Sequence, residues 1–97
     1  MPLHILNAAP GTQAITNCLH QLSMGEPVVL LGDATYAAIA GCETLHLLQT
    51  AGAQLFALQD DAQLRGVIDK LDAGVSVIGL SELVALTEES PVQFSWF

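Results

Sequence analysis

Two cysteines are the residues in this sequence best suited to covalent chemistry. Cys18 lies in the stretch ITNCLHQL, and Cys42 follows a glycine. A cysteine is a strong nucleophile only as a thiolate, which a nearby cation favours. Neither cysteine has such a cation nearby in sequence. His20 is two residues from Cys18, but it lies about 200° around the helix from it. Cys18 instead shares an apolar helical stripe with Ala14, Ile15, Leu19 and Leu22. This pattern favours packing in a core over catalysis, whereas Cys42 falls in a loop and is expected to be more exposed.

Acidic residues that follow predicted strands are a second set of candidates. Asp33 and the pair Asp60 and Asp61 would face one edge of a parallel sheet, where they could perform acid–base catalysis. An acid at such a position also accepts backbone N–H groups at the start of a helix, and we favour this structural role. Arg65 follows Asp61 by four residues, a spacing that suits an exposed ion pair on a helix.

Motifs for cofactors, metals and hydrolysis are missing from the sequence. His4, His20 and His46 form no spaced pair with a cysteine or an acid, although a triad of distant residues stays open. There is no glycine-rich nucleotide motif, no Cys-x-x-Cys pair and no nucleophile elbow. We therefore expect no nucleotide cofactor and no metal, and hydrolase chemistry has little support.

The composition points to a protein that buries part of its surface against partners. The chain has 97 residues, which predicts one domain over residues 1–97. Apolar residues make up 52% of it and charged residues only 12%, whereas about 25% is usual for soluble domains. The net charge is −8, with Arg65 and Lys70 as the two basic residues. This balance argues against direct binding to nucleic acids or anionic membranes, both of which attract basic residues.

Targeting and membrane signals are also missing. The longest strongly apolar runs, PVVLLG and VSVIGL, are too short to span a bilayer. The first ten residues, MPLHILNAAP, contain no basic segment followed by a long apolar segment, so we expect no signal peptide. These features predict a cytoplasmic protein with reduced thiols.

The apolar pattern predicts strands that alternate with short helices. Strands are expected over 3–7, 28–32, 54–59 and 75–80, and residues 92–97 form a fifth strand or an extended tail. Helices are expected over 12–24, 34–40, 43–50, 60–71 and 82–88, with Thr12, Asp33 and Ser81 as caps. This alternation predicts an α/β fold: a three-layer α/β/α sandwich with a mostly parallel sheet of about five strands. Sites in such sheets lie beyond the carboxyl ends of the strands, here 7–11, 32–36 and 59–61.

Aromatic residues gather at the end of the chain. Strand alternation places Phe94 and Trp96 on one face and Phe97 on the other. Because aromatic side chains bury large areas, we expect this segment to dock on its own sheet or on a partner subunit.

Several blocks of the sequence resemble the TusB/DsrH family of bacterial sulfur-relay subunits. LHILN followed by Pro10 is similar to the family's opening. FALQDDAQLRG is similar to the family's strand that is followed by an acidic turn and Arg-Gly. NCLHQLSMGEPVVLLGDATYAAIAG resembles its helix, turn, strand and Asp-x-x-Tyr-Ala-Ala segment, and SPVQFSW its Gln-x-x-Trp ending. The resemblance covers nearly the whole chain. Ala34 departs from it, since many relatives have glycine after the aspartate.

This resemblance implies a DsrE-like fold and a heterohexamer with two copies each of three related subunits. In the TusBCD branch, TusC-like and TusD-like subunits are the partners, and sulfur passes from a TusA-like to a TusE-like carrier. That sulfur ends in 2-thiouridine at the tRNA wobble position. In the DsrEFH branch, the complex serves dissimilatory sulfur oxidation. For both branches the resemblance implies that the principal persulfide cysteine lies on the TusD/DsrE subunit, and that Cys18 matches a helix cysteine of DsrH-type members.

The sequence therefore predicts a TusB-like subunit of a cytoplasmic sulfurtransferase complex, with a mainly architectural role. Cys18 is its candidate accessory persulfide thiol, expected to be dispensable or secondary. Three alternatives stay open: a DsrH-like subunit for sulfur oxidation, a stand-alone thiol sulfurtransferase that uses Cys18, and a homo-oligomeric binding module without chemistry.

Overall fold

Five parallel strands form the centre of the molecule, described here for residues 1–97 from a computed structural model. The strands are β1 (Leu3–Leu6), β2 (Pro27–Leu30), β3 (Gln54–Leu58), β4 (Ser76–Ile78) and β5 (Gln93–Trp96). Their order is β4-β3-β2-β1-β5, and every neighbouring pair is parallel. β2 lies in the middle of this sheet and is buried along its whole length, as its continuous run of apolar residues predicts.

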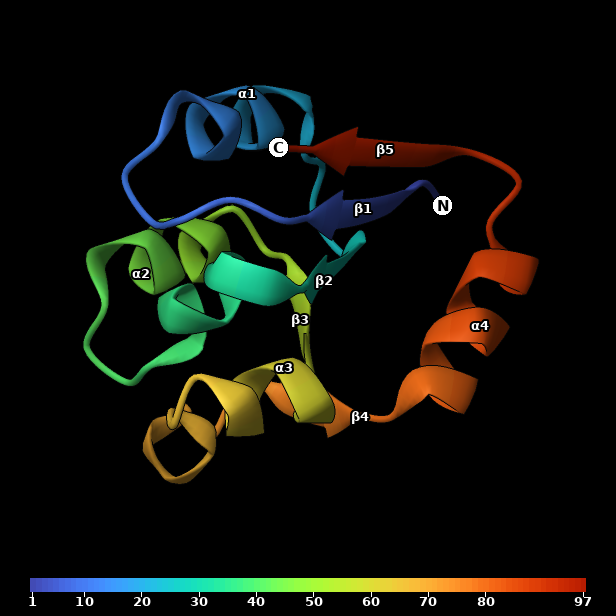
Figure 1. Cartoon of the computed structure of the whole chain (residues 1–97). Coiled ribbons are helices and arrows are strands. Elements are labelled where there is room, and N and C mark those ends of the chain that lie inside the picture. The colour runs from blue at the N-terminus through green and yellow to red at the C-terminus, as the bar shows by residue number, and fades with distance from the viewer.

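Helices lie on both faces of the sheet and give it three layers. The helical elements are α1 (Gln13–Gln21), η1 (Gly32–Ala38), α2 (Glu43–Thr50), α3 (Gln59–Leu64), η2 (Ile68–Lys70) and α4 (Leu80–Glu89). α1 and α2 lie on one side, and α4 lies alone on the other (Figure 1). The predicted three-layer α/β/α sandwich with about five mostly parallel strands is confirmed. No helix is both long and apolar enough to cross a membrane.

The two faces of the sheet carry apolar cores of different size. Twelve buried residues form the core beneath α1, η1 and α2, and Cys18 is one of them. The core beneath α4 has three buried residues, Leu3, Val29 and Ile78. The strand alternation that separates these two sets also places Phe94 and Trp96 on the face of α1, because both pair in register with His4 and Leu6. The C-terminal segment is therefore a fifth strand of its own sheet.

Three local predictions are wrong or incomplete. The helix expected over 60–71 ends at Leu64, because Gly66 takes a left-handed conformation with φ +70° before η2 begins. Ser81 does not cap α4; the helix begins at Leu80, and the Gly79 N–H donates a hydrogen bond of 2.6 Å to Glu82. Thr12 stands at the N-cap of α1, but its hydroxyl donates to the Ala9 carbonyl at 2.8 Å instead of accepting from the helix.

Candidate functional site

Cys18 lies on the inner face of α1 and is fully buried. Its side chain belongs to the larger core, together with Ile15 from the same helix and Leu30 from β2. Burial raises the pKa of the Cys18 thiol to about 11, and the Glu26 carboxylate adds to this effect. The thiol is therefore neutral near pH 7 and closed to solvent, which is the opposite of the environment that activates a cysteine.

A buried polar network stands next to this cysteine. His4 in β1 is fully buried, and its Nε2 lies 2.9 Å from Glu26 Oε1, in the turn before β2. The Trp96 Nε1–H from β5 donates to His4 Nδ1 at 3.1 Å, and the Ser23 N–H donates to Glu26 at 2.8 Å. The imidazole also stacks on Phe94 and Trp96, with ring centroids 5.4 and 6.2 Å away.

The hydrogen bonds of this network fix the tautomer of His4. Because the Trp96 indole can only donate, His4 Nδ1 must accept and carries no proton. The proton of the neutral ring then lies on Nε2 and is donated to Glu26. Burial raises the pKa of Glu26, but the hydrogen bonds from Ser23 and His4 outweigh it and hold that pKa below its usual value. Glu26 is thus an ionised, hydrogen-bonded carboxylate at neutral pH.

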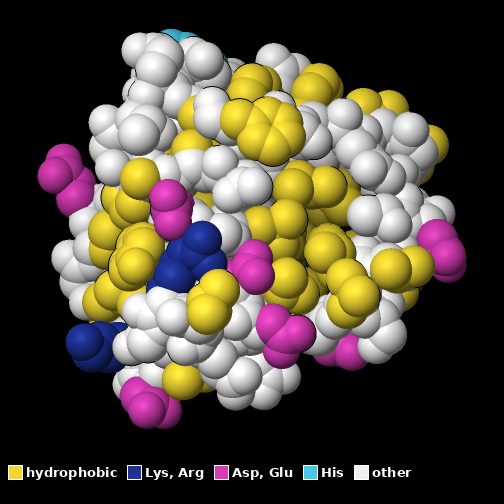
Figure 2. All heavy atoms as spheres, in the orientation of Figure 1, with side chains coloured by type: hydrophobic (Ala, Val, Ile, Leu, Met, Phe, Trp, Pro, Cys, Tyr) yellow, Lys and Arg dark blue, Asp and Glu magenta, His cyan; other side chains and the backbone are white.

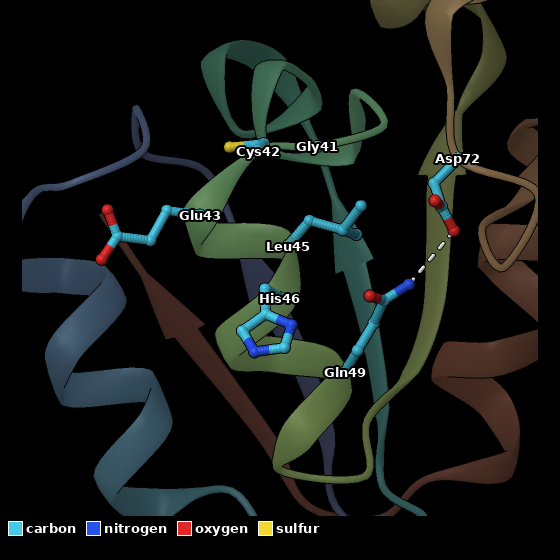
Figure 3. Close-up of a pocket in the computed structure, with 7 residues that line it drawn as sticks. All are labelled: Gly41, Cys42, Glu43, Leu45, His46, Gln49 and Asp72. Carbon is cyan, nitrogen blue, oxygen red and sulfur yellow. Dashed lines mark hydrogen bonds between the residues drawn. The ribbon is translucent and has the colours of Figure 1, made fainter.

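Cys42 has a different environment, at the N-cap of α2. Its half-buried side chain lines an open depression of about 390 Å³ together with Gly41, Glu43, Leu45, His46, Gln49 and Asp72. Gln49 reaches toward Asp72 and donates to it at 3.1 Å, while the Cys42 sulfur points away from both (Figure 3). No lysine or arginine lines this depression. Cys42 is therefore the more accessible thiol, as the sequence predicts, and His46 is the one basic side chain that shares its depression.

The three predicted strand ends meet beside Gly32. The Gly32 N–H, at the start of η1, donates to Asp61 Oδ2 at 2.7 Å, so Asp61 has the structural role favoured from the sequence. Gly32 has φ +54°, and a Cβ there would clash with the Asn7 side-chain oxygen. Arg65 pairs with Asp33 at 3.0 Å, so the expected pairing of Arg65 with the Asp61 side chain is wrong. Asp61 therefore accepts an N–H group, whereas Asp33 accepts from a guanidinium. The prediction that Asp33 caps a helix is wrong, because η1 already begins at Gly32 and Asp33 makes no cap hydrogen bond.

The other candidate residues are not brought together into a catalytic arrangement. His20 and His46 lie exposed on α1 and α2, and no group of three or more His, Cys, Asp or Glu side chains is arranged to hold a metal ion. Sequence reasoning missed the network of His4, Glu26 and Trp96. Its one visible signal is a histidine in an otherwise apolar strand, LHIL, because a buried imidazole needs polar partners.

Comparison with known proteins places this arrangement in a family. The family model described as "DsrH like protein" matches residues 9–93. The chain belongs to the DsrH-like family. Over 94 residues, this DsrH-like chain is 35% identical to the protein TusB of Pectobacterium atrosepticum and 34% identical to the protein TusB of Klebsiella pneumoniae strain 342. Each alignment covers 97% of this chain and 99% of the relative.

Solved structures support the same fold at lower identity. The crystal structure of the ychN protein from E. coli has a TM-score of 0.73 and 19% identity, and the match covers 98% of this chain and 97% of that one. Protein MTH1491 from Methanobacterium thermoautotrophicum has a TM-score of 0.70 and 19% identity, with 97% and 96% covered. These likenesses concern the fold alone.

Proposed function

We propose that this chain is a TusB-like subunit of a TusBCD-like sulfurtransferase complex, which relays persulfide sulfur toward 2-thiouridine at the tRNA wobble position. The observation that carries this proposal is the similarity to proteins named TusB along nearly the whole of both sequences. The predicted partners are TusC-like and TusD-like subunits in a cytoplasmic heterohexamer. Residues 1–97 act in it as one domain, and TusA-like and TusE-like carriers interact with the complex as a whole.

Within that complex the proposed role of this chain is architectural. Persulfide transfer needs an accessible thiolate, whereas Cys18 is buried and its pKa is raised to about 11. We therefore assign the principal persulfide cysteine to a partner subunit and keep Cys18 as an accessory thiol at most. The excess of ten acidic over two basic residues supports a subunit that does not bind tRNA itself.

Deletion of the gene in its own organism tests this proposal. Mass spectrometry of tRNA nucleosides should show loss of wobble 2-thiouridine, and a plasmid copy of the wild-type gene should restore it. A Cys18→Ala copy should restore it too, and Cys42→Ala serves as the matched control. An unchanged 2-thiouridine level in the deletion strain contradicts the proposal. Failure of Cys18→Ala alone, with the complex intact, contradicts only the architectural role.

A DsrH-like subunit in dissimilatory sulfur oxidation is the second candidate function. The match of residues 9–93 to the family model described as "DsrH like protein" favours it. The neighbouring genes distinguish the two pathways. Genes for TusC-like, TusD-like and TusE-like proteins favour tRNA thiolation, whereas sulfite-reductase genes favour sulfur oxidation.

A further inference from the structure

The face of the sheet beneath α4 is only partly covered. Its core has three buried residues, and Ile5, Leu31, Phe56 and Leu83 pack against them while remaining only partly buried. No residue of α4 is buried. The opposite face, under α1, η1 and α2, has twelve buried residues. One helix of ten residues is therefore too little to cover five strands on this side.

The apolar surface continues onto the flank of α4. Leu80 and Val84 are 67% and 46% exposed. The spacing of three residues places Leu80 beside the inward-facing Leu83, and the spacing of four places Val84 beside Leu80. We call Ile5, Leu31, Phe56, Leu80, Leu83 and Val84 the α4-side patch. Hydrophobic side chains gather between the sheet and α4 in the space-filling view (Figure 2). Contiguous apolar surface of this kind marks an interaction site on soluble proteins.

Acidic residues border the α4-side patch. Asp33 follows Leu31 by two residues, and Glu82 and Glu88 lie on the two flanks of α4, all with exposed carboxylates. Arg65 is the nearby base, and it is already paired with Asp33. Acidic side chains with one basic neighbour adjoin the hydrophobic area in Figure 2. The patch thus has an apolar centre and a negative rim.

This charge pattern selects the kind of partner. A second copy of the chain carries the same net charge of −8 and would bring like charges together around the patch. We propose that the α4-side patch is the docking surface for a different protein subunit, whose own face has an apolar centre surrounded by lysine or arginine. This inference rests on the proposed function, which supplies such a subunit within the sulfur-relay complex.

Co-expression with the TusC-like and TusD-like proteins of the same organism tests the surface. The double variant Leu80→Glu, Val84→Glu places two carboxylates in the patch, and affinity for the partners should fall at least about 30-fold, as for hot-spot residues. Leu64→Glu on α3 is the matched control, since Leu64 is 81% exposed and lies outside the patch; its affinity should stay within about twofold of wild type. Thermal melts check that each variant folds.

A charge-reversing variant tests the rim. Binding of the wild type should weaken as salt rises, and Glu88→Lys should weaken it several-fold at low salt and reduce the salt dependence. Equal assembly of the wild type and the double variant overturns the docking surface but leaves the proposed function standing. Failure of the wild type to assemble overturns both. Self-association of the chain alone, abolished by the double variant, would identify a second copy as the occupant and also overturn the inference.

Discussion

Cys18 should resist alkylation in the folded protein, whereas Cys42 should react. A thiol with an ordinary pKa of 9.0 is about 1% thiolate at pH 7, and one with a pKa of about 11 is about 0.01% thiolate. The raised pKa alone thus slows the reaction of Cys18 about 100-fold, and complete burial slows it further by excluding the reagent.

Iodoacetamide labelling followed by intact-mass spectrometry measures this difference. At pH 7 the wild type should gain one adduct rapidly, and the Cys42→Ala variant should gain none on that timescale. Cys18→Ala should behave like the wild type, and both thiols should react in guanidinium. A second rapid adduct on the folded wild type, or fast labelling of Cys18 below about pH 7, would refute the reasoning and favour a stand-alone thiol sulfurtransferase.

The same pKa shift predicts an alkaline loss of stability. The unfolded chain releases the Cys18 proton near pH 9, whereas the folded chain holds it until about pH 11. Between these values the unfolded state binds fewer protons, so the free energy of unfolding falls as pH rises, by about 3 kcal/mol in all. Urea titrations from pH 8 to 11 should show this loss in wild type and Cys42→Ala but not in Cys18→Ala. Equal slopes in all three would contradict the burial of the thiol.

Three further predictions concern the buried network and the strand ends. Trp96→Phe should lower the free energy of unfolding, measured by urea denaturation, by about 1 kcal/mol, because His4 loses its hydrogen-bond donor. An unchanged urea midpoint would contradict that hydrogen bond. Glu26→Gln should flatten the acid side of the stability profile, because the lowered pKa of Glu26 contributes stability that is present above its unfolded value of 4.5 and lost as pH falls; profiles from pH 3 to 7 that stay parallel would contradict this. Gly32→Ala should lower the free energy of unfolding by more than about 1 kcal/mol, because of its positive φ and the clash with Asn7, and a neutral effect would mean that the turn rearranges.

The three layers and the alternation of strands with helices follow from local patterns in the sequence. Buried apolar runs such as Pro27–Leu30 and the stripe that contains Cys18 define which surfaces must face each other. Glu43–Thr50 has the bounds expected from its apolar spacing. The prediction of a helix over 60–71 is wrong because the apolar pattern continues through Gly66, whose left-handed conformation follows a helix of only 6 residues.

The buried network was beyond the reach of local patterns. His4 and Trp96 are 92 positions apart and meet only because β5 returns to pair beside β1. Arg65 shows the same limit in a simpler case. Its four-residue spacing from Asp61 suggests an ion pair within one helix. Instead the Arg65 guanidinium forms its ion pair with Asp33, which follows the neighbouring strand β2. Partners of polar side chains are decided by topology, which spacing within one element does not encode.

The buried network of His4, Glu26 and Trp96 stabilises a negative charge on Glu26, whereas a reactive Cys18 thiolate would need a positive charge nearby. Glu26 is held as a carboxylate by His4 and Ser23, and through His4 it is linked to Trp96 in the edge strand. The same negative charge disfavours a thiolate at Cys18. A site evolved to activate that thiol would place a cation there, whereas this one places an anion and encloses the sulfur in the core. The hydrogen bonds beside Cys18 therefore connect β5 to β1 and do not activate the thiol.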